Sequence, residues 1–306
     1  MAALLNVENL SVAAHGRQIL HEISLDIEEG EYWGLVGASG AGKSMLARSI
    51  AGLLPRGVVV KDGRILYRGA DWLKMKEAER QRVRGGGIGY LVQNTASGLD
   101  PVYTVEQQMV ETLLANNCAD SKEDAIEISA SWLKKVGFSK TQRILASYPH
   151  SLSGGMAQRV YLAMVFMLNP DLVIADEFSS GLDSTTEKEM LGLLFQVVGN
   201  SSLLMITHNI LLLEGLTDKL AVMIGGMIVE AGKTEEILRM PLHGYSKALL
   251  SAGNDGISIA PQILGVAEDV CCCPFFRRCD APEKDCFDKL PPITDVEGRK
   301  VRCHRY

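Results

Sequence analysis

The sequence predicts an α/β protein with an antiparallel β portion, a helical insertion and a cysteine-rich C-terminal extension. Three observations support this prediction. Short apolar runs of strand length alternate with helical patterns both early and late in the chain. The middle of the chain has mostly helical patterns, and six of the seven cysteines fall at or after residue 271.

The first third of the chain combines strands with one strand–loop–helix unit. Residues 4–12 and 22–27 alternate apolar and polar side chains, as half-buried strands do. Residues 32–36 are apolar and lead into a glycine-rich turn. A helix is expected from Lys43 to about Leu54, because Pro55 stops it. Residues 58–67, interrupted by Asp62-Gly63, predict a hairpin.

Helical patterns dominate the middle, and strands return after it. Helices are expected over residues 105–116, 121–137 and 157–168, the second beginning with a capping box of Ser121 and Asp124. Further strands are expected at 172–175, 203–206, 220–224 and 227–230, and a further helix at 185–198. Periodicity fades after about Ala252. We therefore expect a main domain of residues 1–252, with a helical subdomain at about 95–168, and an extension of residues 253–306.

Composition limits the possible partners. The net charge is −6 and the pI is about 5.6, which argues against a nucleic-acid partner, because such proteins usually have a basic face. No secretion signal is visible, and no uninterrupted apolar run approaches the roughly 18 residues of a membrane span. We expect a chain in the cytoplasm that works at a membrane only through partners.

A phosphate-binding motif follows the apolar run at residues 32–36. The pattern G-x-x-x-x-G-K-[ST], typical of a P-loop, is matched by Gly37, Ala38, Ser39, Gly40, Ala41, Gly42, Lys43 and Ser44. Glycines let backbone N–H groups turn toward phosphate oxygens, Lys43 places a charge near the β- and γ-phosphates, and Ser44 can bind Mg²⁺. A strand before the motif and a helix after it favour a nucleotide site in a P-loop (RecA-like) core over a chance turn.

A second acidic centre ends the apolar run at residues 172–175. Asp176 is placed to bind Mg²⁺, and Glu177 is placed to polarise the attacking water. Such a pair is by itself most often an ordinary strand end. Together with the P-loop, it indicates hydrolysis of Mg·ATP.

A third motif, Leu-Ser-Gly-Gly-Met at residues 152–156, offers a further anion site at the head of a helix. Its phosphate-binding residues would be Ser153, Gly154 and Gly155. The motif resembles the signature of ABC ATPases, usually written L-S-G-G-Q. In that family two ATPase subunits face each other, and each ATP is held by the P-loop of one subunit and the signature of the other.

Other elements of the family follow in order. Gln93 resembles the Q-loop glutamine, which contacts Mg²⁺ and senses the membrane partner. Residues 180–183, Ser-Gly-Leu-Asp, resemble the D-loop. His208 resembles the switch histidine that contacts the γ-phosphate, whereas a lone histidine would more often be structural. The resemblance covers residues 4–252 and implies a subunit that hydrolyses ATP.

Three segments resemble the peptide/nickel importer branch of this family. They are Tyr-Pro-His at 148–150 before the signature, Ser-Gly-Leu-Asp-Pro at 97–101, and His-Gly-Tyr-Ser-Lys-Ala-Leu-Leu at 243–250, with Gly244 where proline is usual. The resemblance implies a heterodimer with a second, non-identical ATPase subunit at the cytoplasmic face of the membrane. It also implies two transmembrane permease subunits and an extracytoplasmic solute-binding protein, with peptides, nickel or metallophores as solutes.

The cysteine-rich extension resembles the C-terminal pattern of the same branch. Cys273, Cys279, Cys286 and Cys303 are the expected ligands of a [4Fe–4S] cluster, which some branch members carry. Zinc is an alternative, and so is no metal at all, with the cysteines packed as small apolar residues. Cys271 and Cys272 are additional and could replace a ligand.

The chain departs from the family pattern at several positions. Met156 replaces the signature glutamine, and Asn209 stands where many relatives have aspartate. His15 is the candidate for stacking on adenine, with an ordinary loop residue as the other interpretation. None of these changes removes a catalytic group. Two other functions compete: a soluble ABC ATPase without a membrane partner, and an iron–sulfur regulatory protein that uses ATP as a signal.

Overall fold

The computed structural model describes residues 3–92, 98–179, 183–254 and 272–306. These residues group into two units, and each is described by itself. Unit 1 comprises residues 1–75 and 204–306, and unit 2 comprises residues 76–203. Among the described residues, no helix is long and apolar enough to cross a membrane.

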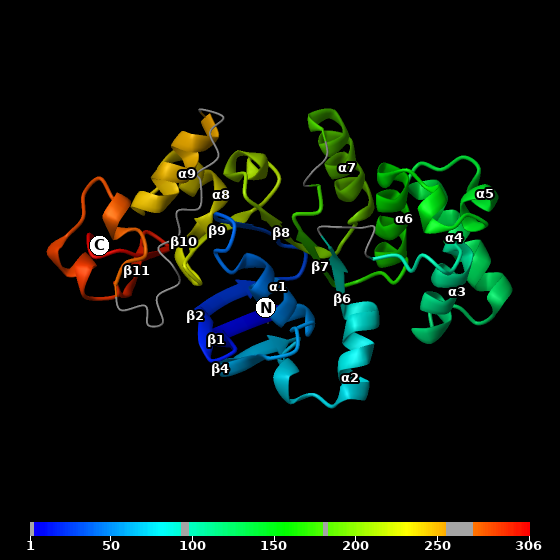
Figure 1. Cartoon of the computed structure of the whole chain (residues 1–306), viewed down its shortest axis with the longest axis horizontal. Helices are drawn as coiled ribbons and strands as arrows, with labels where there is room; N and C mark the ends of the chain where they lie inside the picture. Colours follow the sequence, from blue (N-terminus) through cyan, green and yellow to red (C-terminus); the bar gives the residue numbers. More distant parts are fainter. Residues whose placement is uncertain (1–2, 93–97, 180–182, 255–271) are drawn as a thin grey trace. The chain divides into compact units, whose positions relative to one another are not determined.

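An antiparallel sheet forms the first part of unit 1. Its strand order is β2-β1-β4-β5, and Figure 1 shows β2, β1 and β4 side by side. The bounds are β1 (Leu5–Ala14), β2 (Arg17–Ile27), β4 (Val58–Tyr67) and β5 (Ala70–Asp71). The antiparallel β portion expected from the alternating residues is therefore present.

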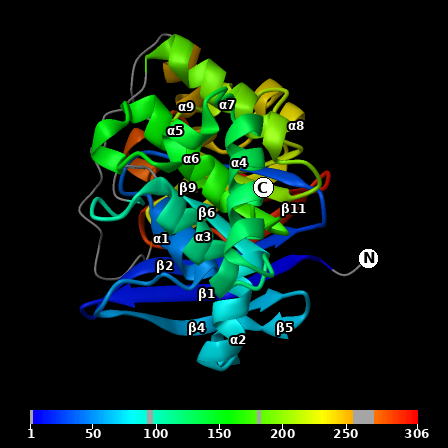
Figure 2. The same ribbon diagram turned by 90° about the vertical axis from the view of Figure 1, so that its right-hand side faces the viewer.

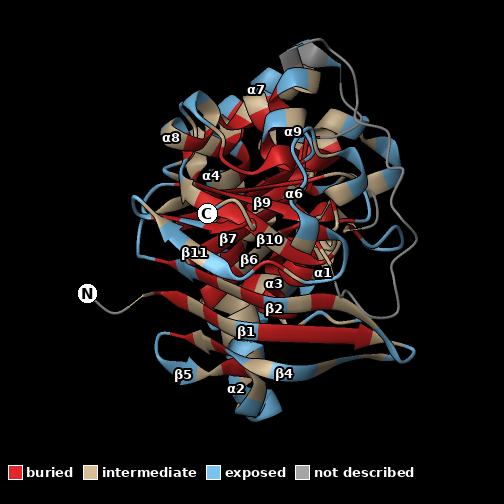
Figure 3. Ribbon diagram, turned by 90° about the vertical axis from the view of Figure 1, so that its left-hand side faces the viewer, coloured by how far each residue is buried: buried red, intermediate tan, exposed pale blue. Residues whose placement is uncertain are grey.

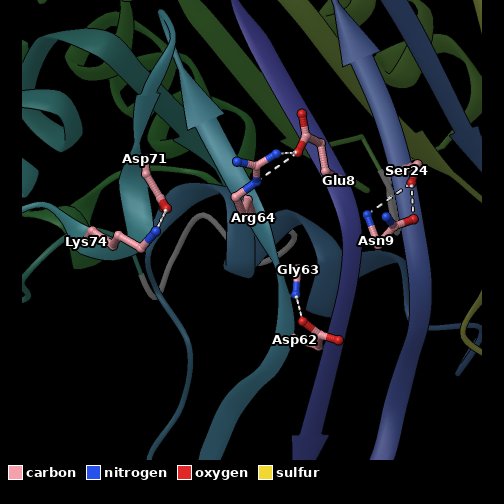
Figure 4. A network of polar contacts seen from close by, with 8 residues as sticks. All are labelled: Glu8, Asn9, Ser24, Asp62, Gly63, Arg64, Asp71 and Lys74. Carbon is pink, nitrogen blue, oxygen red and sulfur yellow. Dashed lines mark hydrogen bonds and ion pairs between the residues drawn. The ribbon is translucent and has the colours of Figure 1, made fainter.

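The hairpin expected at residues 58–67 is wrong, because β4 is one continuous strand paired with β1. The register shifts between Glu8 and Ser11, where Asp62 and Gly63 lie opposite. Gly63 has a φ of +90°, and a Cβ there would come within 2.5 Å of the Glu8 carbonyl oxygen. Asp-Gly is a strong turn signal, but here it forms an irregularity inside a strand. Figure 4 shows this region, where Glu8 and Arg64 form an ion pair across β1 and β4.

A second sheet completes unit 1. Within this unit its order is β11-β12-β10-β9-β3-β8. The bounds are β3 (Tyr32–Val36), β8 (Ser202–Thr207), β9 (Lys219–Ile224), β10 (Met227–Lys233), β11 (Ile293–Val296) and β12 (Arg299–Arg302). β3 runs parallel to β9, whereas β9 and β10 form an antiparallel pair whose side chains are largely buried (Figure 3). Short helices α1 (Lys43–Ala51), α8 (Thr234–Arg239) and α9 (Gly244–Asn254) belong to the same unit.

The C-terminal extension contributes two of these strands. Glu230 and Ala231 of β10 pair with Val301 and Lys300 of β12, which in turn pairs with β11. Strands were not expected here, because β12 reads Arg-Lys-Val-Arg and lacks an apolar alternation. Its two arginines, Arg299 and Arg302, are nevertheless buried. The domain boundary near residue 252 remains a prediction.

Unit 2 contains a parallel strand pair and a group of helices. β6 (Ile88–Leu91) pairs with β7 (Leu172–Asp176). The helices, which lie close together in Figure 2, are α3 (Val105–Ala115), α4 (Lys122–Lys135), α5 (Thr141–Leu145) and α6 (Gly154–Phe166). Half of the expected capping box of α4 is present, since the Ser121 hydroxyl accepts a hydrogen bond from the Asp124 N–H at 3.1 Å. The Asp124 carboxylate accepts from the Asp120 N–H at 3.0 Å and not from the Ser121 N–H that a capping box requires. The helical insertion expected at residues 95–168 therefore contains α3 to α6. The unit also contains α2 (Glu77–Arg82) and α7 (Ser184–Val197).

Candidate nucleotide-binding site

The P-loop of unit 1 joins β3 to α1. Gly37 must be glycine for steric reasons, because a Cβ there would lie 2.1 Å from the Met223 carbonyl oxygen of β9. Gly42 has a φ of +100°, a conformation that side chains with a Cβ rarely adopt. The motif glycines therefore allow the loop to turn closely over β9 and to enter α1. The helix ends at Ala51, three residues before the expected Leu54, and Gly52 caps it in the left-handed conformation.

Backbone hydrogen bonds fix the loop to its own unit. The Gly226 N–H, in the turn between β9 and β10, donates to the Ala41 carbonyl at 3.0 Å. The Gly226 carbonyl accepts from the His21 N–H of β2 at 2.9 Å. Inside the loop, the Ala41 N–H donates to the Ala38 carbonyl at 3.1 Å. The turn between β9 and β10 thus binds the P-loop directly, and β2 of the other sheet in turn binds that turn.

Lys43 lies against the start of the loop. Its Nζ donates to the Gly37 carbonyl at 2.8 Å and to the Ala38 carbonyl at 3.1 Å, and the side chain is only 5% exposed. A buried ammonium needs such partners, because burial without them costs several kcal/mol. The structure therefore brings the lysine charge to the loop, at the N-terminal end of α1 where anions are favoured.

The two histidines of unit 1 have different surroundings. His15 lies in the turn between β1 and β2 with a φ of +50°. A Cβ added at Gly57 would lie 2.8 Å from the His15 ring, so the ring sits against that residue. His208 is exposed and directly follows β8. The next residue, Asn209, caps a short 3₁₀ helix by accepting from the Leu211 N–H at 3.1 Å, which explains how asparagine serves at this position.

The Asp-Glu pair of unit 2 follows the buried strand β7. Asp176 is 4% exposed, and its Oδ2 accepts a hydrogen bond from the Tyr90 hydroxyl of β6 at 2.8 Å. The Tyr161 hydroxyl of α6 donates to the Tyr90 carbonyl at 3.1 Å. Tyr90 was missed in the sequence, where its only signal is a polar tip on the strand that precedes Gln93.

Glu177 has an unusual backbone. Its φ is +46°, in the left-handed region that non-glycine residues seldom occupy. Such strain costs on the order of 1–3 kcal/mol and clusters at functional sites. The next residue is held from α6, since the Gln158 side chain donates to the Phe178 carbonyl. The helix that carries the signature therefore also supports the segment that carries Glu177.

The signature residues begin α6. Ser153 is the N-cap, and its hydroxyl accepts from the Met156 N–H at 3.4 Å. Gly154 and Gly155 form the first turn, and a Cβ at either would meet no atom within 4 Å. Their backbone N–H groups and the positive end of a 13-residue helix offer an anion site that side chains do not cover.

The other motif residues are partly outside the described chain. Gln93 lies among residues 93–97, and Ser180, Gly181 and Leu182 lie in a second such segment, so the structure does not describe them. Asp183 is described, and it caps α7 by accepting from the Thr185 and Thr186 N–H groups at 3.1 Å. The hydrogen bonds from Thr186 lower the pKa of the Asp183 carboxyl.

The four candidate cysteine ligands lie near one another in unit 1. Cys273, Cys286 and Cys303 are buried, and Cys279 is partly exposed. Burial raises the pKa of the Cys273 thiol to about 11, with smaller contributions from the thiols of the other three. The Cys273 N–H donates to the Cys286 carbonyl at 3.3 Å. Within the described part of the chain, however, no group of three or more His, Cys, Asp or Glu residues is placed to hold a metal ion.

The P-loop, His15 and His208 belong to unit 1, whereas Asp176, Glu177 and the signature belong to unit 2. A family model described as ABC transporter matches residues 20–180, which include the P-loop, the signature and the Asp-Glu pair. The chain belongs to the ABC transporter family. The expected membership of the ABC ATPase family is therefore confirmed, and the chain is an ATPase subunit of this family.

Relatives match this ABC subunit over most of its length. The dipeptide transport ATP-binding protein DppD of Lactococcus lactis is 34% identical, over 81% of this chain and 73% of the relative. DppD of Bacillus subtilis is 35% identical, over 99% of this chain and 95% of the relative. A putative peptide import ATP-binding protein of Brucella abortus is 32% identical, over 99% of this chain and 97% of the relative.

Solved structures share the fold of this ABC subunit. The structure of cbiO1 from Clostridium perfringens, part of the ABC transporter complex cbiONQ, has a TM-score of 0.66 and 25% identity. It covers 78% of this chain and 92% of its own. The ATP-binding cassette MJ0796, solved as a dimer bound to ADP and Pi, also has a TM-score of 0.66 and is 23% identical. It covers 75% of this chain and 98% of its own, and the likeness concerns the fold alone.

Proposed function

We propose that this ABC ATPase powers an importer of peptides. The observation that carries the proposal is its similarity, at 32–35% identity, to three ATP-binding proteins named for peptide transport or import. Two of these matches span 99% of this chain and so include the cysteine-bearing extension. Nickel and metallophores are the other solutes that the branch resemblance implied, and peptides are favoured because the relatives carry that name.

The residues of the P-loop are assigned to the phosphates of ATP. The loop Gly37–Ser44 would surround the phosphates with its backbone N–H groups, except those of Ala38 and Ala41, which donate to the Tyr245 hydroxyl and the Ala38 carbonyl. The Lys43 ammonium would lie at the β- and γ-phosphates. Ser44, Asp176 and Gln93 would hold the Mg²⁺ that accompanies ATP as substrate. His15 would stack on adenine. The support is the close-packed loop over β9 and the short Lys43 contacts to the loop carbonyls.

Hydrolysis is assigned to Glu177 and His208. Glu177 would orient a water and accept its proton as the water oxygen attacks the γ-phosphorus in line. The bond to the β-phosphate oxygen breaks, and ADP and inorganic phosphate leave. His208 would contact the γ-phosphate. The strained backbone at Glu177 supports this role, since strain of this kind is retained where a side chain must be aimed.

The second half of each site would come from a different subunit. Ser153, Gly154 and Gly155 would bind the γ-phosphate held by the P-loop of the second, non-identical ATPase, so that two ATP molecules close the heterodimer. Closure would push two permease subunits at the cytoplasmic face of the membrane through the Q-loop surface around Gln93. An extracytoplasmic binding protein would deliver the solute. The support is the uncovered helix start at the signature.

Gly155→Ala tests this role of the signature. An added methyl meets no atom within 4 Å, and alanine favours a helix by about 1 kcal/mol over glycine, so the chain should remain folded. The ATPase activity of the assembled heterodimer should fall at least about tenfold, because the methyl would stand where the partner's γ-phosphate binds. Steady-state turnover and thermal melting measure the two effects.

Gly192→Ala is the matched control. Gly192 also lies inside a helix, α7, and a Cβ there meets no atom within 4 Å. It should gain the same stability and keep its ATPase activity. Equal ATPase activities of the two variants would show that the signature does not bind the nucleotide of the partner subunit.

We assign the cysteine cluster of the extension to a [4Fe–4S] centre. In such a centre each thiolate binds a different iron. Three of the four thiols are buried and one is partly exposed, and the other three contribute to the raised pKa of the Cys273 thiol, which supports a centre shared by all four. Cys273, Cys279, Cys286 and Cys303 would hold the centre, which would contribute structure to the tail. Zinc is the alternative occupant.

Purification from native membranes under anaerobic conditions tests both assignments. We expect a second ATPase and two polytopic proteins to co-purify with the chain, together with about four irons per complex from this chain.

Cys303→Ser should lose the iron, whereas Cys118→Ser, in unit 2, should retain it. A chain that purifies alone would favour the soluble ABC ATPase, and zinc or no metal would overturn the cluster.

A further inference from the structure

The start of the P-loop, at Ala38, is held by a side chain that is distant in the sequence. The Ala38 N–H donates a hydrogen bond to the Tyr245 hydroxyl at 2.8 Å, although the two residues are 207 positions apart. Both belong to unit 1. Tyr245 lies in the first turn of α9 and is 2% exposed. Because its phenol is buried, its hydroxyl is a fixed partner and not a mobile surface group.

The start of α9 is itself held rigidly. The Tyr245 N–H donates to His243 Nδ1 at 3.0 Å. The buried carboxylate of Glu230 accepts from the N–H groups of Leu242 and His243, each at 2.9 Å. Glu230 belongs to β10, so the residues before Tyr245 are tied to the sheet of unit 1. These contacts fix where the Tyr245 hydroxyl meets the loop.

The aromatic ring of Tyr245 packs against the C-terminal extension. Its centroid lies 5.5 Å from that of Phe275, at an interplanar angle of 58°, which is a favourable arrangement for an aromatic pair. Phe275 is buried and also lies 6.3 Å from the His243 ring. Its neighbours in sequence include Cys273, whose Sγ is 4.0 Å from His243 Nε2. Phe275 of the extension is therefore in contact with the ring of the residue whose hydroxyl binds Ala38.

The packing at Gly244 shows how closely the extension sits. A Cβ at this position would lie 3.2 Å from Cys279 Sγ and 3.4 Å from the Phe275 ring. The start of α9 and the cysteine-bearing segment are therefore in direct contact. This crowding also gives a physical reason for glycine at residue 244.

We propose that Tyr245 is a positioning residue of the P-loop and that Phe275 holds it in place, so that the C-terminal extension sets the affinity for nucleotide. Without the Tyr245 hydroxyl, the Ala38 N–H would need another partner or remain unsatisfied. The loop around Ala38 would then be less ordered. A loop that is not ordered beforehand loses more conformational entropy when it binds phosphate, which weakens binding. Packing of Phe275 restricts the Tyr245 ring and thereby the hydroxyl.

The proposal rests on the assignment of Gly37–Ser44 to the phosphates. It is tested on the purified full-length chain by calorimetric titration with Mg·ADP. Tyr245→Phe keeps the ring and removes the hydroxyl, and a lost hydrogen bond of ordinary strength predicts about three- to tenfold weaker binding. In the ATPase assay, KM for ATP should rise while kcat changes less than about twofold, because no reacting group is altered.

Ser246→Ala is the matched control, since the neighbouring Ser246 hydroxyl is buried without a hydrogen-bond partner among the described residues. Its affinity for Mg·ADP should stay within about twofold of the wild type. A wild-type chain that does not bind Mg·ADP would refute the phosphate assignment. A wild-type chain that binds, with Tyr245→Phe binding equally or more tightly, would overturn the positioning role alone.

A double-mutant cycle tests the link to the extension. Phe275→Leu should weaken Mg·ADP binding about two- to fivefold in the wild type and less than about 1.5-fold in Tyr245→Phe, because Phe275 acts through the hydroxyl. Thermal melting verifies that both variants are folded, and Phe275→Met, which fills a similar volume without a ring, replaces Phe275→Leu if the latter is not. Equal effects of the Phe275 change in both backgrounds, or no effect in either, would overturn the link.

Discussion

Glu177→Gln is expected to abolish ATP turnover and to leave nucleotide binding intact. General-base catalysis contributes about 10²- to 10⁴-fold, so steady-state hydrolysis by this site should fall by at least about a hundredfold. The amide has the same shape as the carboxylate and can keep the backbone at its φ of +46°. The loss would therefore report the missing base and not a changed fold. Phosphate release by the purified complex measures it.

The control for this experiment is Glu189→Gln. Glu189 lies on α7, and its exposed carboxylate is 3.7 Å from Arg159, an ion pair that contributes little at a surface. This variant should hydrolyse ATP at the wild-type rate. If Glu177→Gln does so as well, Glu177 is not the residue that activates the water.

Lys43→Met is expected to cause the second large effect. The Nζ atom is placed at the P-loop by the Gly37 and Ala38 carbonyls, and methionine keeps the apolar stem without the charge. Hydrogen bonds from charged groups contribute about 1.5–3 kcal/mol each, and 1.4 kcal/mol corresponds to about tenfold. Affinity for Mg·ATP should therefore fall about a hundredfold, as measured by equilibrium binding.

The thermal stability of the Lys43→Met variant without nucleotide should hardly change. Removing the buried ammonium relieves its desolvation cost but takes a donor from the Gly37 and Ala38 carbonyls, so the two effects offset and the melting temperature without nucleotide should change little. Lys247→Met is the control, because Lys247 is an exposed residue of α9. It should leave affinity unchanged. A Lys43→Met variant that binds Mg·ATP normally would contradict the placement of the phosphates at this loop.

Local patterns predicted the parts of the molecule that local sequence determines. The P-loop was predictable because a tight turn between a strand and a helix needs glycines in a fixed order, and Gly37 is now seen against the Met223 carbonyl. The cap of α4 was predictable for the same reason, since Ser121 and Asp124 lie within one helical turn.

Features that depend on distant residues could not be predicted from these patterns. The Tyr245 hydroxyl binds the Ala38 N–H although 207 positions separate the two residues, so no local pattern indicates the contact. Asp62-Gly63 has the composition of a hairpin turn, but pairing with β1 keeps β4 continuous. β12 was missed because Arg299 and Arg302 are buried, which a pattern of apolar alternation does not anticipate.

The central claim, that hydrolysis by this chain drives peptide import, is tested most directly by uptake of a radiolabelled dipeptide in intact cells. Cells whose own copy is replaced by the wild-type chain should accumulate the peptide, and cells with Glu177→Gln should not. Uptake of radioactive nickel, measured in parallel, should be equal in both. Equal peptide uptake in the two strains would contradict the claim, and a loss confined to nickel would assign the other solute.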